Sequence, residues 1–282
     1  MPVRRLSGGF TLVELLVAVV LLAIIGQVTV RLLTGSQRIT RSQRERIALQ
    51  ASVRGGALLV PAELRELGSS GGSSDILAFG RDSVTYRAMR STSVACALTP
   101  ARITLRRALT FGYRVQSAGR DSVMVFLDGD PVDTLDDVWA AFPITGAPAG
   151  GTCPDGSAGT VLPTAIPLAL AGRVVLDAPV RTFEVMQLRL YRSGAQYWLG
   201  ARSVSAGEAQ LQPVLGPLAA NGFELTMLDA NAAPVSGISS VRMIGIMLRG
   251  LSETAVSDGA SPRAVLADSL TSRIRLRNVP LD

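Results

Sequence analysis

The sequence contains no histidine and only two cysteines among its 282 residues. Without histidine, the chain lacks the Ser-His-Asp and Cys-His arrangements that activate a nucleophile, and the residue used in most catalytic zinc sites. The GxxxxGK[ST] and GxGxxG patterns of nucleotide-binding loops are absent as well. These absences predict that the protein is not an enzyme, and nothing in the sequence indicates a cofactor.

Lysine is also missing, so all 28 basic residues are arginine, against 22 acidic residues and a net charge of +6. Arginine and acidic residues are interleaved in residues 38–46 and 63–66, which weakens any single positive field. A genome rich in G and C explains the arginine content, and a surface for nucleic acid is the less favoured interpretation. The short basic clusters are Arg102, Arg106, Arg107 and Arg273, Arg275, Arg277.

A long apolar run lies near the N-terminus, after a short basic leader. Residues 10–30 contain one charged residue, Glu14, and as a helix they span about 30 Å, the thickness of the hydrocarbon core of a bilayer. The small residues Ser7-Gly8-Gly9 precede this run, whereas a secretory signal peptide has its cleavage site after the apolar segment. Cleavage after Gly9 would therefore remove only a leader, residues 1–9, and leave the apolar helix on the mature chain.

Glu14 is the one charged residue of the apolar run, and a carboxylate within a membrane segment costs about 2.5–3.5 kcal/mol. Two interpretations of it remain open. In the first, Glu14 lies in the first turn of the helix and complements the helix dipole. In the second, it neutralises the α-amino group that cleavage creates on Phe10 of a neighbouring subunit.

Arg4 and Arg5 predict that the leader stays on the cytoplasmic side, which places the residues after Val30 outside. Two cysteines in an oxidising compartment usually form a disulfide. The sequence therefore predicts a bond between Cys96 and Cys153, worth about 4 kcal/mol by the chain-entropy relation. Two unpaired thiols are the alternative.

The residues Gly8-Gly9-Phe10-Thr11-Leu12-Val13-Glu14-Leu15-Leu16 resemble the type IV prepilin motif. In that motif glycine precedes the cleavage site, phenylalanine follows it, and glutamate is the fifth residue of the mature chain. The resemblance covers residues 1–30. It implies cleavage between Gly9 and Phe10 by a prepilin peptidase, N-methylation of the Phe10 amine, and pairing of Glu14 with the N-terminus of a neighbour.

After the apolar run, residues 31–67 predict an amphipathic helix that continues the first one and packs on the rest of the protein. Pro61 is expected to kink or restart this helix, and the Gly/Ser-rich residues 68–74 predict a flexible linker. Short alternating segments then predict a mainly antiparallel β head over residues 75–282. The expected fold class is α+β, with a long N-terminal helix packed on this head, a pilin-like layout.

Eight strands are expected in the head, and the Gly/Pro-rich residues 143–172 predict a long loop between its two halves. The size and strand layout of the head resemble PilW-type minor pilins and the J-type pseudopilins of type II secretion. The expected strands are Ser83–Met89, Arg102–Arg107, Ser122–Leu127, Phe183–Tyr191, Tyr197–Val204, Phe223–Leu228, Val241–Leu251 and Ser272–Val279.

Residues 128–137 are rich in aspartate. Clustered carboxylates are the ligands that calcium prefers, and Asp128, Asp130, Asp133, Asp136 and Asp137 could supply them, with the first three as the calcium candidates singled out. The spacing is not that of an EF-hand, and Asp-Gly and Asp-Pro are common turn residues. A hairpin turn is therefore the favoured interpretation, and no metal is predicted.

Together these features predict a minor pilin or pseudopilin, a structural subunit for assembly or initiation of a type IV pilus or a type II secretion pseudopilus. Its partners would be other pilins, the prepilin peptidase and the inner membrane. The chain would cross that membrane once, with a periplasmic head, and then enter a periplasmic or cell-surface filament. The alternative is a membrane-anchored adhesin or DNA-uptake module, in which Arg273–Arg277 would contact nucleic acid.

Overall fold

A computed structural model of the chain describes residues 11–70, 73–112, 114–130, 132–133, 136–256 and 263–277. The chain divides into two compact units. One comprises residues 1–49 and 252–266, and the other comprises residues 50–251 and 267–282. The sheet-containing part of the second unit is called the head.

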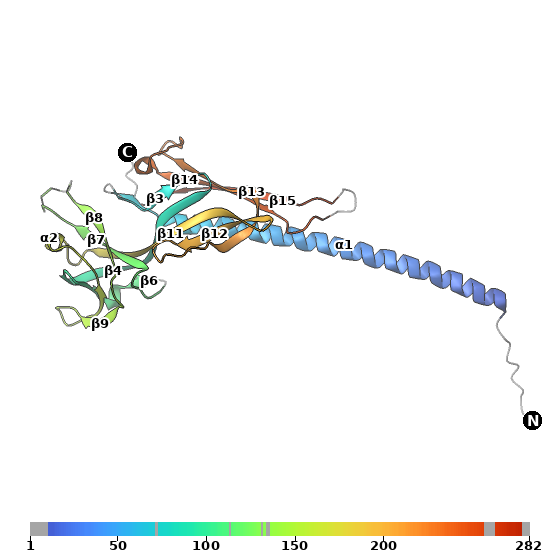
Figure 1. Ribbon diagram of the computed structural model, residues 1–282, viewed down its shortest axis with the longest axis horizontal. Coiled ribbons are helices and arrows are strands. Elements are labelled where there is room, and N and C mark those ends of the chain that lie inside the picture. Colours follow the sequence, from blue (N-terminus) through green and yellow to red (C-terminus); the bar gives the residue numbers. More distant parts are fainter. Residues whose placement is uncertain are drawn as a thin grey trace, which may run out of the picture. The chain divides into compact units, whose positions relative to one another are not determined.

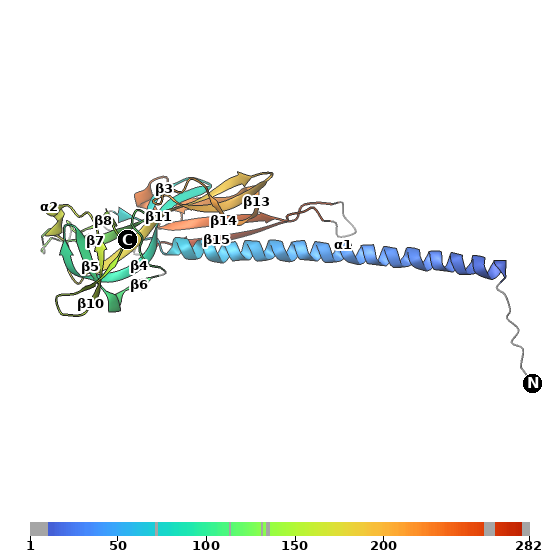
Figure 2. The same ribbon diagram turned by 60° about the horizontal axis from the view of Figure 1, so that its bottom comes forward.

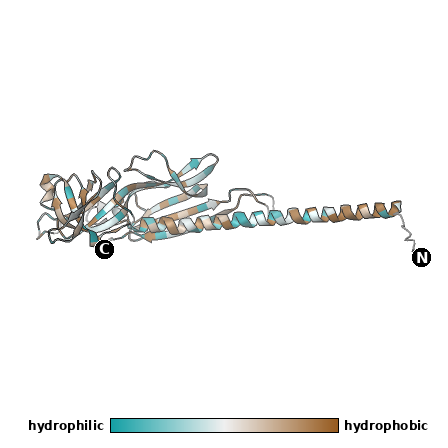
Figure 3. Cartoon of the chain, turned by 90° about the horizontal axis from the view of Figure 1, so that it is seen from below, coloured by the Kyte–Doolittle hydropathy of each residue, from teal (hydrophilic) through white to brown (hydrophobic). Residues whose placement is uncertain are grey.

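A single helix, α1, runs from Leu12 to Arg65. The sequence accounts for its first part, in which apolar residues predominate from Leu12 to Leu33, interrupted by Glu14, Gln27 and Arg31, and remain exposed (Figure 3). The helix continues through Pro61, so the predicted restart of the helix at this residue is wrong. Val60 and Leu64, on either side of Pro61, are fully buried, and this packing outweighs the one backbone hydrogen bond that a proline removes.

The head contains a 13-stranded sheet in which every strand pair is antiparallel. The fold class predicted from the sequence, a long N-terminal helix on a mainly antiparallel β head, is therefore confirmed. Its main path is β15-β14-β13-β12-β11-β4-β5-β10-β9, with β3 and β6 beside β4, and β7 between β11 and β8 (Figure 1). The strands are β3 (Ile76–Phe79), β4 (Ser83–Thr99), β5 (Arg102–Arg106), β6 (Phe111–Gly112), β7 (Asp121–Leu127), β8 (Val138–Pro143), β9 (Ala149–Thr152), β10 (Ala158–Pro163), β11 (Pro179–Ser193), β12 (Gln196–Ser203), β13 (Gln212–Leu228), β14 (Met243–Leu251) and β15 (Ala267–Arg275).

Two hydrophobic cores stabilise the head. The first lies between the C-terminal part of α1 and the sheet, and includes Val60, Leu64, Tyr86, Leu199, Phe223 and Ile244. The second lies where β5, β7, β8 and β10 gather at one end of the head (Figure 2), and includes Ile103, Val123, Phe142, Leu162 and Val180. The long strands β4 and β11 contribute to both cores, so they connect the two halves of the head.

A buried charge network lies between the two halves of the head, where the pairing of β4 with β11 shifts in register. Thr182 pairs with Ser91 and Phe183 pairs with Met89, which leaves Arg90 as the extra residue of a β-bulge. Bulges re-aim side chains, and here Arg90 Nε donates to Glu184 Oε2 at 2.9 Å. The Glu184 side chain is only 1% exposed.

Two further arginines complete this network. Arg114 donates to Glu184 at 2.9 Å and makes two hydrogen bonds of 2.6 and 2.7 Å to the fully buried Asp121. Arg120 Nε donates to the other oxygen of Glu184. Burial raises the pKa of Glu184, but hydrogen bonds from the Ser203 side chain and from the three guanidinium groups lower it to about 2. The carboxylate is therefore held ionised inside the sheet.

Each of the eight predicted strands overlaps a strand of the structure, and the last one does so over Ser272–Arg275. The predicted loop at residues 143–172 is wrong, because it contains β9, β10 and the short helix α2 (Leu168–Ala171). The sequence Ala149-Gly-Gly-Thr152 has no apolar alternation, and β9 forms because it pairs with β10, which in turn pairs with β5.

Residues 68–74 also differ from the flexible linker that the sequence predicts. Short strands β1 (Ser69–Ser70) and β2 (Ser73–Ser74) pair with each other. The residues that flank them are held together, since the buried Asp75 accepts a hydrogen bond from the Gly68 amide at 2.8 Å and returns one to its carbonyl at 2.9 Å.

Candidate processing and assembly site

The described part of the N-terminal site begins at Thr11, while Gly9 and Phe10 lie outside the described residues. The Thr11 hydroxyl accepts a hydrogen bond from the Glu14 amide at 3.3 Å. In return Glu14 Oε2 accepts one from the Thr11 amide and one from its hydroxyl, both at 3.0 Å. This reciprocal pair is a capping box, which satisfies free backbone donors at the start of α1.

The capping box bears on the two interpretations of Glu14. It gives the carboxylate a role within its own chain, in the first turn of the helix, as the first interpretation requires. The Thr-x-x-Glu pattern at residues 11–14, directly ahead of an apolar run, was visible in the sequence and is the signal that the sequence analysis missed. Both contacts of the carboxylate use Oε2; among the described residues, Oε1 has no hydrogen-bond partner.

The helix that follows Glu14 is long and apolar enough to cross a membrane, by its length and composition. Two hydroxyl groups at the end of its apolar part do not remain as free donors. Thr29 donates to the Ile25 carbonyl at 2.8 Å and Thr34 to the Val30 carbonyl at 2.9 Å. Since such bonds hide hydroxyl groups within the helix, Gln27 is the one other polar side chain between Glu14 and Arg31.

Comparison with known families identifies this region. The prokaryotic N-terminal methylation motif matches residues 4–26. No curated protein and no solved structure matches the chain. The motif and the long apolar helix support a type IV pilin-like family, and the motif implies a substrate of a prepilin peptidase that assembles with other pilins.

A disulfide joins Cys96 and Cys153 in the head. Cys96 lies in β4 and Cys153 directly follows β9, and both are buried. The bond crosses 57 positions of the sequence. It therefore ties the Gly-rich strand β9, which has few side chains to bury, to a strand that runs through both cores.

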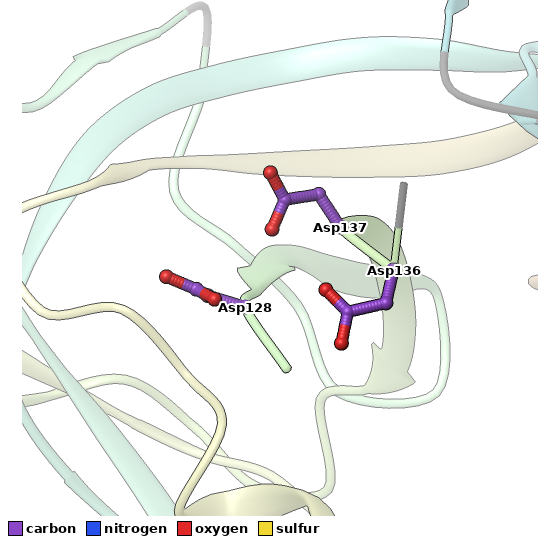
Figure 4. Close-up of side chains that lie close together, drawn as sticks. All are labelled: Asp128, Asp136 and Asp137. Atoms are coloured by element: carbon purple, nitrogen blue, oxygen red, sulfur yellow. The ribbon is translucent and has the colours of Figure 1, made fainter. Parts of the chain in front are cut away.

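The acidic segment forms a different cluster from the one predicted. The carboxylates of Asp128, Asp136 and Asp137 converge, with ligand atoms within 4.8 Å of one another (Figure 4). Asp130 and Asp133 do not belong to this group. Instead, the Asp130 carbonyl accepts a hydrogen bond from the Asp133 amide at 2.9 Å, which is a turn contact. Of the calcium candidates Asp128, Asp130 and Asp133, only Asp128 belongs to the converging group.

The guanidinium group of Arg173 lies beside the converging carboxylates. Arg173 lies 3.8 Å from the Asp136 carboxylate and donates to the Asp128 and Asp136 carbonyls at 3.3 and 3.1 Å. Burial, together with the neighbouring Asp128, Asp136 and Asp133, raises the pKa of Asp137. The cluster is thus an acidic turn closed by an arginine, and we assign no ligand to it.

The two basic clusters of the head are partly neutralised. Arg106 forms ion pairs with Asp155 and Asp177, and Arg277 lies 3.8 Å from Glu66. A continuous positive stripe, which the nucleic-acid interpretation needs, would have to include these paired arginines. The pairing reduces the support for that interpretation.

Proposed function

We propose that this chain is a minor pilin or pseudopilin, a non-catalytic subunit that takes part in the assembly or initiation of a type IV pilus or a type II secretion pseudopilus. The observation that carries the proposal is the methylation motif at residues 4–26, followed directly by a capped, exposed apolar helix. The absence of histidine supports the non-catalytic part. The size of the chain supports a low-copy subunit.

The mechanism has two steps. Cleavage after Gly9 frees the amine of Phe10, which becomes the methylated N-terminus beside Glu14. During assembly the carboxylate of Glu14 pairs with the N-terminus of a neighbouring subunit, because both groups would otherwise lie without a counter-charge among apolar helices. The oxygen Oε1, which the capping box does not use, is the free acceptor for that pair.

The location follows from the same features. The apolar helix would anchor the subunit in the inner membrane, with the head outside the cytoplasm. The disulfide between Cys96 and Cys153 supports that side, since disulfides persist in oxidising compartments. The apolar helix would then leave the membrane to enter the core of the filament.

The test compares two variants that separate capping from pairing. Glu14→Gln removes the charge, whereas Thr11→Val removes the hydroxyl contacts of the capping box and keeps the carboxylate. Mass spectrometry should show mature chains that begin at methylated Phe10 for both. Only Glu14→Gln should fail to enter filaments. A mature chain that still begins at Met1 would contradict the processing step, and equal failure of both variants would reduce Glu14 to a helix cap.

A further inference from the structure

A segment of the first unit is attached to the middle of α1. Within residues 252–266, Val256 and Ala264 exchange two backbone hydrogen bonds of 3.0 Å and so form a narrow hairpin. Glu45 on α1 accepts hydrogen bonds from the Thr254 hydroxyl at 2.8 Å and from its amide at 3.3 Å. Both oxygens of Glu45 are therefore used to hold the base of this hairpin.

A cavity of about 300 Å³ lies in this unit, and its lining is basic. Arg38 and Arg41, one helical turn apart, line it from α1, and Arg263 lines it from the hairpin. Ala255 and Val256 complete the lining. Among the described residues, none of these three arginines forms an ion pair.

The charge balance around the cavity is strongly positive. Residues 31–49, 252–256 and 263–266 contain six arginines and two carboxylates, Glu45 and Glu253. Glu45 is engaged by Thr254, as described, and Glu253 is exposed. Bringing unpaired guanidinium groups together is unfavourable without a counter-charge. An anion with several acceptor oxygens would provide it, since arginine binds phosphate in a bidentate manner.

The position of the cavity along the helix indicates where this anion comes from. The apolar run ends at Val30, and at 1.5 Å per residue the backbone of Arg38 and Arg41 lies about 12 and 16.5 Å beyond it. The headgroup layer of a bilayer is about 5–8 Å thick on each side. Side chains on a helix tilt toward its N-terminus, which is the membrane side here, and the long arginine side chain carries its charge at its far end. The cavity therefore lies at the outer edge of the headgroup layer whenever α1 spans a membrane, with Arg38 nearest to the headgroups.

We propose that Arg38, Arg41 and Arg263 bind the phosphate of an anionic phospholipid at the membrane surface. The site fixes the depth of the anchored subunit before assembly, because the bound headgroup must be released when the helix leaves the membrane. This proposal shares with the proposed function only the assumption that α1 spans a membrane. It does not depend on the identity of the filament.

The test uses the full chain in non-ionic detergent, with bound phosphatidylglycerol counted by native mass spectrometry during a titration. The wild type should retain one lipid per chain at concentrations at which phosphatidylcholine is not retained. The variant R38Q/R41Q/R263Q should bind phosphatidylglycerol more weakly by roughly fivefold per arginine, or on the order of 100-fold in total. The variant R38K/R41K/R263K, which keeps charge without the planar fork, should fall between the two.

The matched control is R44Q/R46Q/R54Q, which removes three charges from the same helix and leaves the residues that line the cavity unchanged. It should lose less than fivefold. An equal loss in both glutamine variants would overturn the site in favour of a general positive field. Retention of phosphatidylcholine as tight as that of phosphatidylglycerol, or full displacement of the lipid by inorganic phosphate, would overturn the lipid assignment. An intact disulfide in each variant verifies that it is folded. Extraction of the wild type from membranes by carbonate would contradict the proposed membrane anchoring, which is a separate outcome from loss of the lipid site.

Discussion

The substitution Glu184→Gln tests whether the buried charge network holds the two halves of the head together. Glutamine has the size of glutamate, so the change creates no cavity, but it leaves Arg90, Arg114 and Arg120 with one negative charge fewer among them. Removing one partner of a buried ion pair costs about 3–5 kcal/mol. The lowering of the pKa of Glu184 from 4.5 to about 2 agrees with this range, since it corresponds to about 3 kcal/mol.

The assay is urea unfolding of the full chain in non-ionic detergent, followed by tryptophan fluorescence. Both tryptophans, Trp139 in β8 and Trp198 in β12, lie in the head. The control is Glu224→Gln, the same chemical change at a pair whose arginine, Arg81, has a side chain that is 79% exposed. That variant should lose less than about 1 kcal/mol.

The pH dependence gives the same experiment a second readout. Because the pKa of Glu184 is lower in the folded protein than its ordinary value of 4.5, its stabilising contribution is complete above that value and disappears as the pH falls toward 2. The difference between wild type and Glu184→Gln should therefore be constant from pH 7 to 5 and shrink below pH 4.5. A loss below 1 kcal/mol at pH 7, or a difference that does not shrink in acid, would refute the reasoning.

Three other variants use the same assay. Replacing Cys96 and Cys153 by alanine opens a link across 57 positions and should lower the free energy of unfolding by about 4 kcal/mol; an unchanged urea midpoint would count against the bond. In α1, Gly55→Ala meets open space and should stabilise by about 0.5–1 kcal/mol. Gly56→Ala places its Cβ 2.3 Å from Leu215 Cδ2 and should destabilise by about 1–3 kcal/mol. Equal effects of the two glycine variants would contradict the packing described for this helix.

The parts of the fold that local sequence determines were predictable. The apolar run at residues 10–30 predicted the helix, and alternation predicted strands such as Phe183–Tyr191, because side chains on successive strand residues face opposite sides. Strands β9 and β10 were missed for the same reason, since Ala149–Thr152 carries no alternation and depends on its neighbours in the sheet. Likewise, the continuity of α1 through Pro61 depends on packing that only the folded head provides.

The functional sites, like the elements of the fold, differ in whether a local sequence pattern reveals them. The processing site is a contiguous motif, and even its capping box, Thr11 with Glu14, could have been recognised by spacing alone. The basic cavity joins α1 to Arg263, more than 200 positions away, and the network around Glu184 joins residues of β4, β7 and β11. Neither has a local pattern, because both exist only once distant segments pack together.

The arginines that flank the apolar helix predict an orientation in the membrane opposite to the one that the disulfide indicates. Five arginines follow the run within residues 31–46, whereas Arg4 and Arg5 precede it. Counted within about 15–20 residues of each end, this imbalance alone would place the head in the cytoplasm. There the bond between Cys96 and Cys153 would be reduced. Occupation of the cavity by lipid phosphate would neutralise part of the excess positive charge on the head side of the helix. The arginines and the disulfide would then both be compatible with a head outside the cytoplasm. A reporter that is active only outside the cytoplasm, fused to the C-terminus, should therefore be active, and an inactive but intact fusion would show that the arginines, not the disulfide, indicate the side.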